Sequence, residues 1–306
     1  MKFRPPQFVF VLACLLLCGA GVARAQTVAR RASVAVLDFG ETEAARRAAD
    51  ELSATLAKQP HLGLVNRAQG RAAARGVGYA GSLNLTLAEA RDLGASIGCD
   101  FYFTGEADTL RRTSTARPDY VESYASLFLV STQTGRLILW EHFNAEAATP
   151  VEAEKSLLAE LRARAPRYVE MMAKAQDAEQ SERLRAAAAR GDEAGAFEEM
   201  PEEGSPAAAN FRAPLPYRSL RPAYPETAAR AAVEATVDAL VEVDAAGEVK
   251  DIEIVRWAGY GLNEAVTATV RQLHFRPAMR DGRAVPVRVL LRYNFRRPAD
   301  EAKRKG

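Results

Sequence analysis

The stretch that decides the fold lies near the end of the chain and reads Val285-Pro286-Val287-Arg288-Val289-Leu290-Leu291-Arg292-Tyr293-Asn294-Phe295. Every second side chain is apolar or aromatic, and the side chains between them are mostly polar or charged. This period of two is typical of a β-strand that buries one face. The stretch therefore predicts a strand that closes a small sheet.

The residues before this strand predict the rest of a small domain. A first strand ends at Val243, residues 244–247 form a turn, and residues 249–255 are the return strand. A helix then opens at Gly261, with apolar residues spaced three and four apart: Leu262, Ala265, Val266, Val270 and Leu273. Residues 223–297 are thus expected to form a two-layer β-β-α-β module.

An α/β domain with a mixed sheet is predicted over residues 33–173, which makes the fold class of the whole chain α+β. A buried strand at 33–39 is followed by helices, one of which opens with a capping box formed by Thr86 and Glu89. From Asp100 onward the apolar period becomes two, which predicts an antiparallel meander. A helix from Val151 covers the meander, and Pro166 either kinks this helix or starts a second one.

A change of composition separates the two domains. Residues 174–222 are first rich in Ala, Glu, Arg and Gln, and then acidic and rich in Pro. Such a segment forms a solvated helix and a linker, because it has too few large apolar side chains to build a core. Residues 298–306 form a basic tail.

The first 25 residues resemble a signal peptide. Lys2 and Arg4 precede an apolar run of about 15 residues, shorter than the roughly 20 of a membrane helix, and Ala23-Arg24-Ala25 fits a cleavage site. We expect a periplasmic protein after cleavage; the alternative is a protein anchored in the inner membrane by residues 8–23. Cleavage removes three basic residues and no acidic residue, which changes the formal net charge from +2 to −1. Neither value indicates a nucleic-acid partner.

Few residues have the spacing that catalysis or metal binding needs. Cys99 is the one Cys outside the predicted signal peptide, and its apolar context favours a buried thiol with a raised pKa over a nucleophile. Residues 76–81 fit G-x-G-x-x-G, but they follow a predicted helix, whereas a dinucleotide-binding loop follows a strand. The three His are scattered without ligand spacing. We therefore predict no catalytic residue, no metal site and no cofactor.

Six short motifs occur in order within the C-terminal module: Tyr224-Pro225, 234–237, 243–249, 261–263, 275–278 and 282–287. In this order and spacing they resemble the C-terminal domain of the TonB energy-transducer family, with Ala235 and Asn263 where the family usually has Gly and Asp. The resemblance implies a periplasmic domain that pairs a strand with an extended peptide of an outer-membrane transporter. The residues expected at this contact are Tyr224, Pro225, Val287, Arg288, Val289, Leu291, Arg292 and Tyr293. Arg288 and Arg292 also fit a purely structural role, as charges that keep an edge strand soluble.

The N-terminal domain carries a second resemblance. Residues 34–39, 64–67, 90–95 and 100–105 are similar to the periplasmic α/β domains of the curli-secretion lipoprotein and penicillin-binding-protein activator type.

Three functions stay open at this point. The leading hypothesis is a non-catalytic adaptor or energy-transduction-type module that binds a TonB-dependent outer-membrane receptor or an assembly complex by strand pairing. The first alternative is a true energy transducer anchored in the inner membrane. The second alternative is a nucleotide-dependent or hydrolytic enzyme around Asp38 and the loop at Gly76. A homodimer is compatible with an exposed edge strand, so the oligomeric state is open.

Overall fold

The computed structural model describes residues 31–113, 119–189, 197–202 and 204–297. The predicted signal peptide, the alternative anchor and the basic tail lie outside these residues. Within the described part of the chain, no helix has both the length and the apolar character that crossing a membrane requires.

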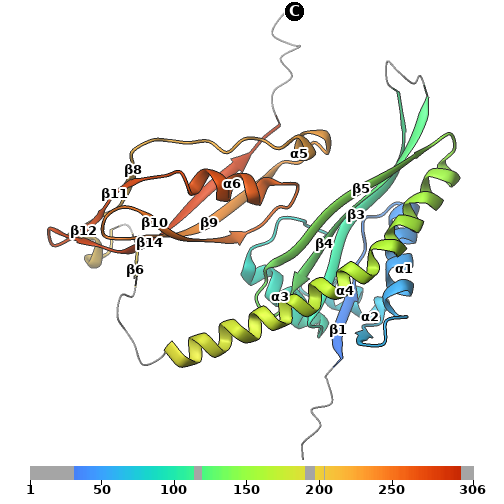
Figure 1. Ribbon diagram of the computed structural model, residues 1–306, viewed down its shortest axis with the longest axis horizontal. Helices are drawn as coiled ribbons and strands as arrows, with labels where there is room; N and C mark the ends of the chain where they lie inside the picture. The colour runs from blue at the N-terminus through green and yellow to red at the C-terminus, as the bar shows by residue number, and fades with distance from the viewer. Residues whose placement is uncertain (1–30, 114–118, 190–196, 203, 298–306) are drawn as a thin grey trace, which may run out of the picture. The chain divides into compact units, whose positions relative to one another are not determined.

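Residues 31–189, the N-terminal lobe, contain one five-stranded sheet (Figure 1). Its strands, in spatial order, are β2 (Leu62–Leu64), β1 (Ala32–Val36), β3 (Phe101–Arg112), β4 (Tyr120–Ser131) and β5 (Leu137–Ala147). β1 pairs in parallel with β2 and β3, whereas β3, β4 and β5 form an antiparallel meander. The mixed sheet and the meander confirm the sequence-based predictions.

Helices cover both faces of this sheet. On one face lie α1 (Glu43–Leu56) and α4 (Pro150–Ala189), which bury apolar side chains such as Leu52 and Tyr168. The ring of Tyr168 lies 5.4 Å from that of Phe103 on β3. On the other face lie α2 (Arg67–Gly76) and α3 (Leu87–Ile97). Coverage on both faces explains why β1 is apolar and buried at every residue except Ser33.

Two predictions about helices of this lobe can be compared with the structure: the capping box of Thr86 and Glu89, and the role of Pro166. The Thr86 hydroxyl accepts a hydrogen bond from the Glu89 amide at 3.1 Å, and the Glu89 carboxylate accepts one from the Thr86 amide at 2.7 Å. This capping box starts α3. Pro166 lies inside the single 40-residue helix α4, so it does not start a second helix. Packing of Leu161 and Tyr168, on either side of Pro166, holds both halves of the helix against the sheet.

Residues 198–297, the C-terminal lobe, are built around β9 (Ala235–Val243), β10 (Val249–Arg256), α6 (Leu262–Val270) and β14 (Val287–Phe295). The three strands are antiparallel, with β9 between β10 and β14, and α6 packs against them (Figure 1). The predicted β-β-α-β module is therefore confirmed. The short helix α5 (Glu226–Arg230) precedes it.

The turn between β9 and β10 depends on a glycine. Gly247 has a φ of +86°, and a Cβ at this position would lie 1.9 Å from the carbonyl oxygen of Phe275. A side chain would therefore face both an unfavourable backbone conformation and a direct clash.

Part of the segment predicted as a linker contributes strands to the C-terminal lobe. β6 (Glu198–Glu199) pairs with β14, β7 (Phe211–Arg212) pairs with β12 (Ala278–Arg280), and β8 (Leu215–Pro216) pairs with β11 (Phe275–Arg276). β12 also pairs with β13 (Arg283–Val285). Composition could not reveal these strands, because backbone pairing needs no large apolar side chains.

Candidate functional site

The candidate site is the edge of β14 that faces away from β9. On one side, β14 pairs with β9 along its whole length, from Val287 opposite Val243 to Phe295 opposite Ala235. On the other side, β6 pairs only with Val287 and Arg288. In the described ranges no strand pairs with residues 289–295 on that side. Seven residues of β14 therefore form an open strand edge.

Alternation along the strand shows which backbone groups face this open edge. The Glu198 amide of β6 donates a hydrogen bond of 2.9 Å to the Pro286 carbonyl, which places that carbonyl on the side away from β9. Because successive residues of a strand point their backbone groups in opposite directions, Arg288, Leu290, Arg292 and Asn294 share this orientation. Their amides and carbonyls are the groups that an added strand would meet.

The apolar residues predicted for the contact point their side chains toward the core. Val287 and Val289 are buried, and Leu291 and Tyr293 are half-buried against the core of the C-terminal lobe. Burial also raises the pKa of the Tyr293 phenol. These four side chains pack into the core, so the open edge presents main-chain amides and carbonyls to a partner.

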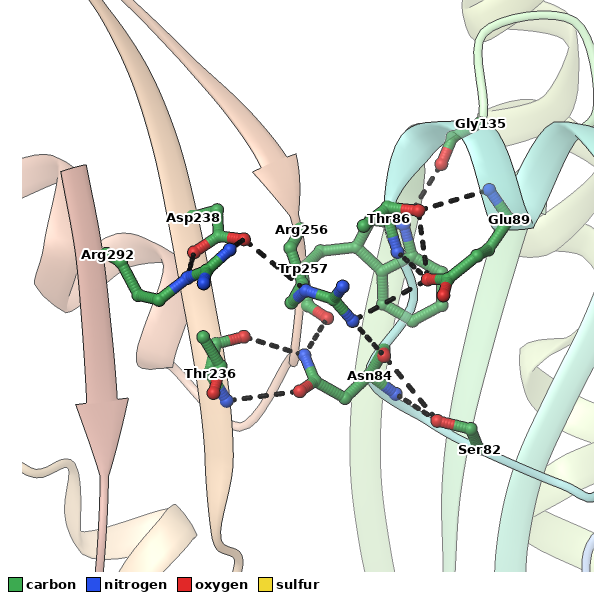
Figure 2. Close-up of polar contacts among 10 residues, drawn as sticks. All are labelled: Ser82, Asn84, Thr86, Glu89, Gly135, Thr236, Asp238, Arg256, Trp257 and Arg292. Carbon is green, nitrogen blue, oxygen red and sulfur yellow. Dashed lines mark hydrogen bonds and ion pairs between the residues drawn. The ribbon is translucent and has the colours of Figure 1, made fainter. Parts of the chain in front are cut away.

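Arg292 is held by a carboxylate on the neighbouring strand. Its Nε and Nη2 donate to the two carboxylate oxygens of Asp238, at 2.7 and 3.0 Å. The Asp238 side chain is 5% exposed, and Nε of Arg256 also lies 3.4 Å from it (Figure 2). The hydrogen bond from Arg292, opposed by burial and assisted by both guanidinium charges, lowers the pKa of Asp238. Arg292 therefore stabilises the outer face of the sheet.

Arg288 contacts carboxylates on both sides of β14. Its Nε and Nη2 donate to one oxygen of Glu242 on β9 at 3.0 and 2.9 Å, and its Nη1 donates to Glu199 of β6 at 3.3 Å. On the same side, Nε of Arg280 donates to Glu198 at 2.6 Å. The sequence prediction did not include Glu198, Glu199 or Arg280. The paired acidic residues were visible in the sequence, but their position beside β14 was not.

Tyr224 and Pro225 lie at the other end of β14. The Tyr224 ring is 6.1 Å from the Phe295 ring, and its hydroxyl donates to the carbonyl of Val233. Pro225 precedes the first residue of α5 and takes an extended conformation there. The predicted residues therefore extend from Tyr224 at one end of the strand to Arg288 at the other.

The opposite edge of this sheet meets the N-terminal lobe. The Asn84 side chain donates to the carbonyls of Thr236 and Trp257 at 2.7 and 2.8 Å and accepts from the Thr236 amide at 3.1 Å (Figure 2). The Trp257 amide donates to the Leu85 carbonyl at 3.1 Å, next to a β-bridge between Thr86 and Arg256. Residues 84–86 thus cover the end of β10.

Aromatic side chains extend this contact between the lobes. Trp257 is 1% exposed, its ring stacks 6.0 Å from that of Phe128, and its indole N–H donates to the Gly135 carbonyl at 3.0 Å. Tyr260 lies 5.0 Å from the Trp140 ring, centre to centre. The sequence prediction missed this role of Trp257 and Tyr260, although two aromatic residues within a glycine-containing loop were a visible signal.

One polar cluster superficially resembles a hydrolase site. Ser126 Oγ lies 2.9 Å from Nδ1 of His142 and 3.3 Å from a carboxylate oxygen of Glu106, which also accepts from the Tyr260 hydroxyl at 2.5 Å. In a catalytic triad the His stands between the nucleophile and the carboxylate, whereas here Ser126 stands between the other two. Ser126 is also fully buried. The cluster is therefore a hydrogen-bond network that runs from the buried Ser126 to the exposed His142.

The residues weighed for the enzyme hypothesis also have structural partners. Asp38 accepts a hydrogen bond of 2.6 Å from Arg67, and Gly76 ends α2 without a preceding strand. Burial raises the pKa of the Cys99 thiol to about 11. Among the residues that the structure describes, no group of His, Cys, Asp and Glu is arranged to hold a metal ion.

Comparison with known proteins identifies the C-terminal lobe. Residues 221–296 match the family described as Gram-negative bacterial TonB protein C-terminal. The resemblance expected from the sequence is thus confirmed for this part of the chain. A search of curated proteins finds no match to the chain.

Solved structures give weaker likenesses. The hypothetical protein CT253 from Chlamydia trachomatis is 13% identical, with a TM-score of 0.34, over 44% of this chain and 95% of that one. The TonB C-terminal domain of Pseudomonas aeruginosa is 18% identical, with a TM-score of 0.25, over 33% and 93%. The LpoB C-terminal domain of Salmonella enterica is 17% identical, with a TM-score of 0.27, over 40% and 87%. At these TM-scores, none of the likenesses bears on function.

Proposed function

We propose that this protein is a non-catalytic adaptor of the cell envelope, whose TonB-type C-terminal domain takes up an extended segment of a partner protein on the open edge of β14. The proposed partner is an outer-membrane receptor or assembly protein, and the proposed location is the periplasm after cleavage of residues 1–25. The N-terminal lobe serves as a second binding module and as the support of the C-terminal lobe.

The observation that carries this proposal is the unequal pairing of β14. One side is fully paired with β9, and on the other side no strand of the described residues pairs with residues 289–295. At about 3.3 Å per residue, this edge is roughly 23 Å long, which is enough for a partner strand of typical length. Exposed edges of this kind take up extended peptides through main-chain hydrogen bonds.

The edge of β10 is partly covered, which supports β14 as the strand that pairs with the partner. Residues 84–86 of the N-terminal lobe cover the end of β10, where Thr86 and Arg256 form a bridge. A strand added along the full length of β10 would meet this segment. The β14 edge has no such obstacle beyond Arg288 in the described residues.

A backbone substitution tests the proposal directly. Leu290 directs its amide toward the open edge and its side chain is 53% exposed, so Leu290→Pro removes one edge donor and leaves the ladder with β9 intact. Leu290→Ala removes the same side chain and keeps the amide. The chain from Gln26 onward, immobilised by a tag, is incubated with detergent-solubilised envelope of the producing cell, and bound proteins are identified by mass spectrometry.

We expect an outer-membrane protein to be retained by the wild type and by Leu290→Ala, and lost with Leu290→Pro. Equal retention by both variants, or equal loss, would refute strand pairing at this edge. If light scattering shows instead a dimer that only Leu290→Pro dissociates, the occupant is a second copy of this chain. Sequencing the N-terminus of the protein from cells separates the adaptor from the anchored transducer, because a chain that begins at Gln26 lacks residues 8–23.

A further inference from the structure

β6 occupies the first part of the edge that we assign to the partner. Glu198 lies opposite Val287 and Glu199 opposite Arg288, in parallel orientation, and the Glu198 amide donates to the Pro286 carbonyl. β6 uses the same set of outward backbone groups that an incoming strand would use. A partner that pairs with the whole of β14 therefore meets a segment of this chain already in place.

Two arginines form ion pairs with the acidic side chains of β6. Arg280 binds Glu198 at 2.6 Å, and Arg288 binds Glu199 at 3.3 Å. Both pairs are partly open to solvent, with 31% and 35% of the first pair's side chains exposed, and 40% and 72% of the second pair's. Exposed ion pairs of this kind change a binding constant by about fivefold or less. The two ion pairs thus favour an acidic strand at this edge, but they contribute little to its affinity.

β6 is short, so its pairing with the β14 edge is weak. β6 has two residues, and both pair with β14. A longer partner strand can instead pair with β14 as far as Phe295 and form more main-chain hydrogen bonds.

We propose that β6 is an intrachain competitor for the β14 edge, which an extended acidic segment of the partner must displace. The inference rests on the proposed function, since it assigns a regulatory role to the same edge. The partner segment carries carboxylates at the positions that face Arg280 and Arg288, on a strand that runs parallel to β14.

Two changes with opposite effects test this competition. Glu198→Pro removes the amide that pairs with Pro286 and the carboxylate that binds Arg280, so it frees the edge. Glu199→Cys together with Arg288→Cys places two thiols at directly opposed positions, where oxidation locks β6 in place. The probe is a fluorescein-labelled synthetic peptide with the sequence of residues 194–202, and its binding to the chain from Gln26 onward is followed by fluorescence anisotropy. Glu202→Ala, an acidic change in the same segment but outside β6, is the matched control.

We expect Glu198→Pro to bind the peptide about tenfold more tightly than the wild type, from the loss of one main-chain hydrogen bond and one ion pair in the competitor. The control should bind like the wild type. The reduced double-cysteine chain, which lacks one of the two arginines, should bind the peptide within about fivefold of the wild type, and the oxidised chain should fail to bind. Cys99 does not interfere, because it is buried.

Two other outcomes separate the competition from the proposed function. Equal binding by the wild type, Glu198→Pro and both redox forms would overturn the competition while leaving the edge a strand-binding site. No binding by Glu198→Pro would overturn both, because a freed edge that keeps Arg280 and Arg288 and accepts no acidic strand is not a partner site.

Discussion

Replacing Arg292 by Ala should destabilise the protein by about 1.5–2 kcal/mol at pH 7. The change leaves the Asp238 carboxylate, 5% exposed, with only the 3.4 Å contact to Arg256. A buried acceptor left without its hydrogen-bond partner costs about 1–3 kcal/mol, and the remaining contact of the Asp238 carboxylate with Arg256 places its loss near the middle of that range. Urea denaturation of the wild type and the variant measures the difference.

The matched control is Arg296→Ala. Arg296 lies on the same face, is 78% exposed and has one 3.4 Å contact with Glu234, so its loss should change the free energy of unfolding by less than about 0.5 kcal/mol. Equal effects of Arg292→Ala and Arg296→Ala on the free energy of unfolding would show that the ion pair of Arg292 and Asp238 does not stabilise the outer face of β14.

The effect of Arg292→Ala should also depend on pH. Arg292 lowers the pKa of Asp238 in the folded state below the unfolded value of about 3.9. The stabilisation is therefore fully present above the unfolded pKa and is lost as pH falls through the folded pKa. The difference between wild type and Arg292→Ala should be constant between pH 6 and 8 and shrink toward pH 3. A difference that is the same at pH 3 and pH 7 contradicts this account.

Three further predictions concern the core and the turns. Trp257→Ala should cost about 3–5 kcal/mol in urea denaturation, whereas Trp257→Phe, which loses mainly the donor to Gly135, should cost about 1–2 kcal/mol; equal costs would argue against that hydrogen bond. Gly247→Ala should destabilise by about 2 kcal/mol or more, because its Cβ would clash with Phe275; an unchanged urea midpoint would contradict this geometry. Cys99 should resist iodoacetamide at pH 8 in the folded protein and react once unfolded; rapid labelling of the folded chain would show an accessible thiolate.

Much of the fold could be predicted from local signals. The period of two in residues 285–295 identified β14 and its buried face, because alternate side chains of a strand point to opposite sides. Thr86 and Glu89 identified the start of α3, because a capping box is formed within four residues. The sequence left the role of Pro166 open, and packing on both sides of it decided in favour of one helix.

The candidate site could be predicted only in part. The sequence placed Arg288 and Arg292 on the polar face of β14, but not the carboxylates of Glu242 and Asp238 that hold them. It also placed Glu198 in a linker, because acidic composition carries no information about which backbone a segment pairs with.

The sequence by itself determined the main strands and helices of both lobes, the buried face of β14, and that residues 221–296 are of the TonB C-terminal type. Only the tertiary structure decided which edge of the C-terminal sheet is open. That choice depends on contacts such as the one between Asn84 and Thr236, which are 152 residues apart, and on the pairing of β6 with the first residues of β14. The physical reason is that side-chain periodicity is a local property of the chain, whereas an open edge is defined by the distant backbone segments that pair with a strand or leave it unpaired.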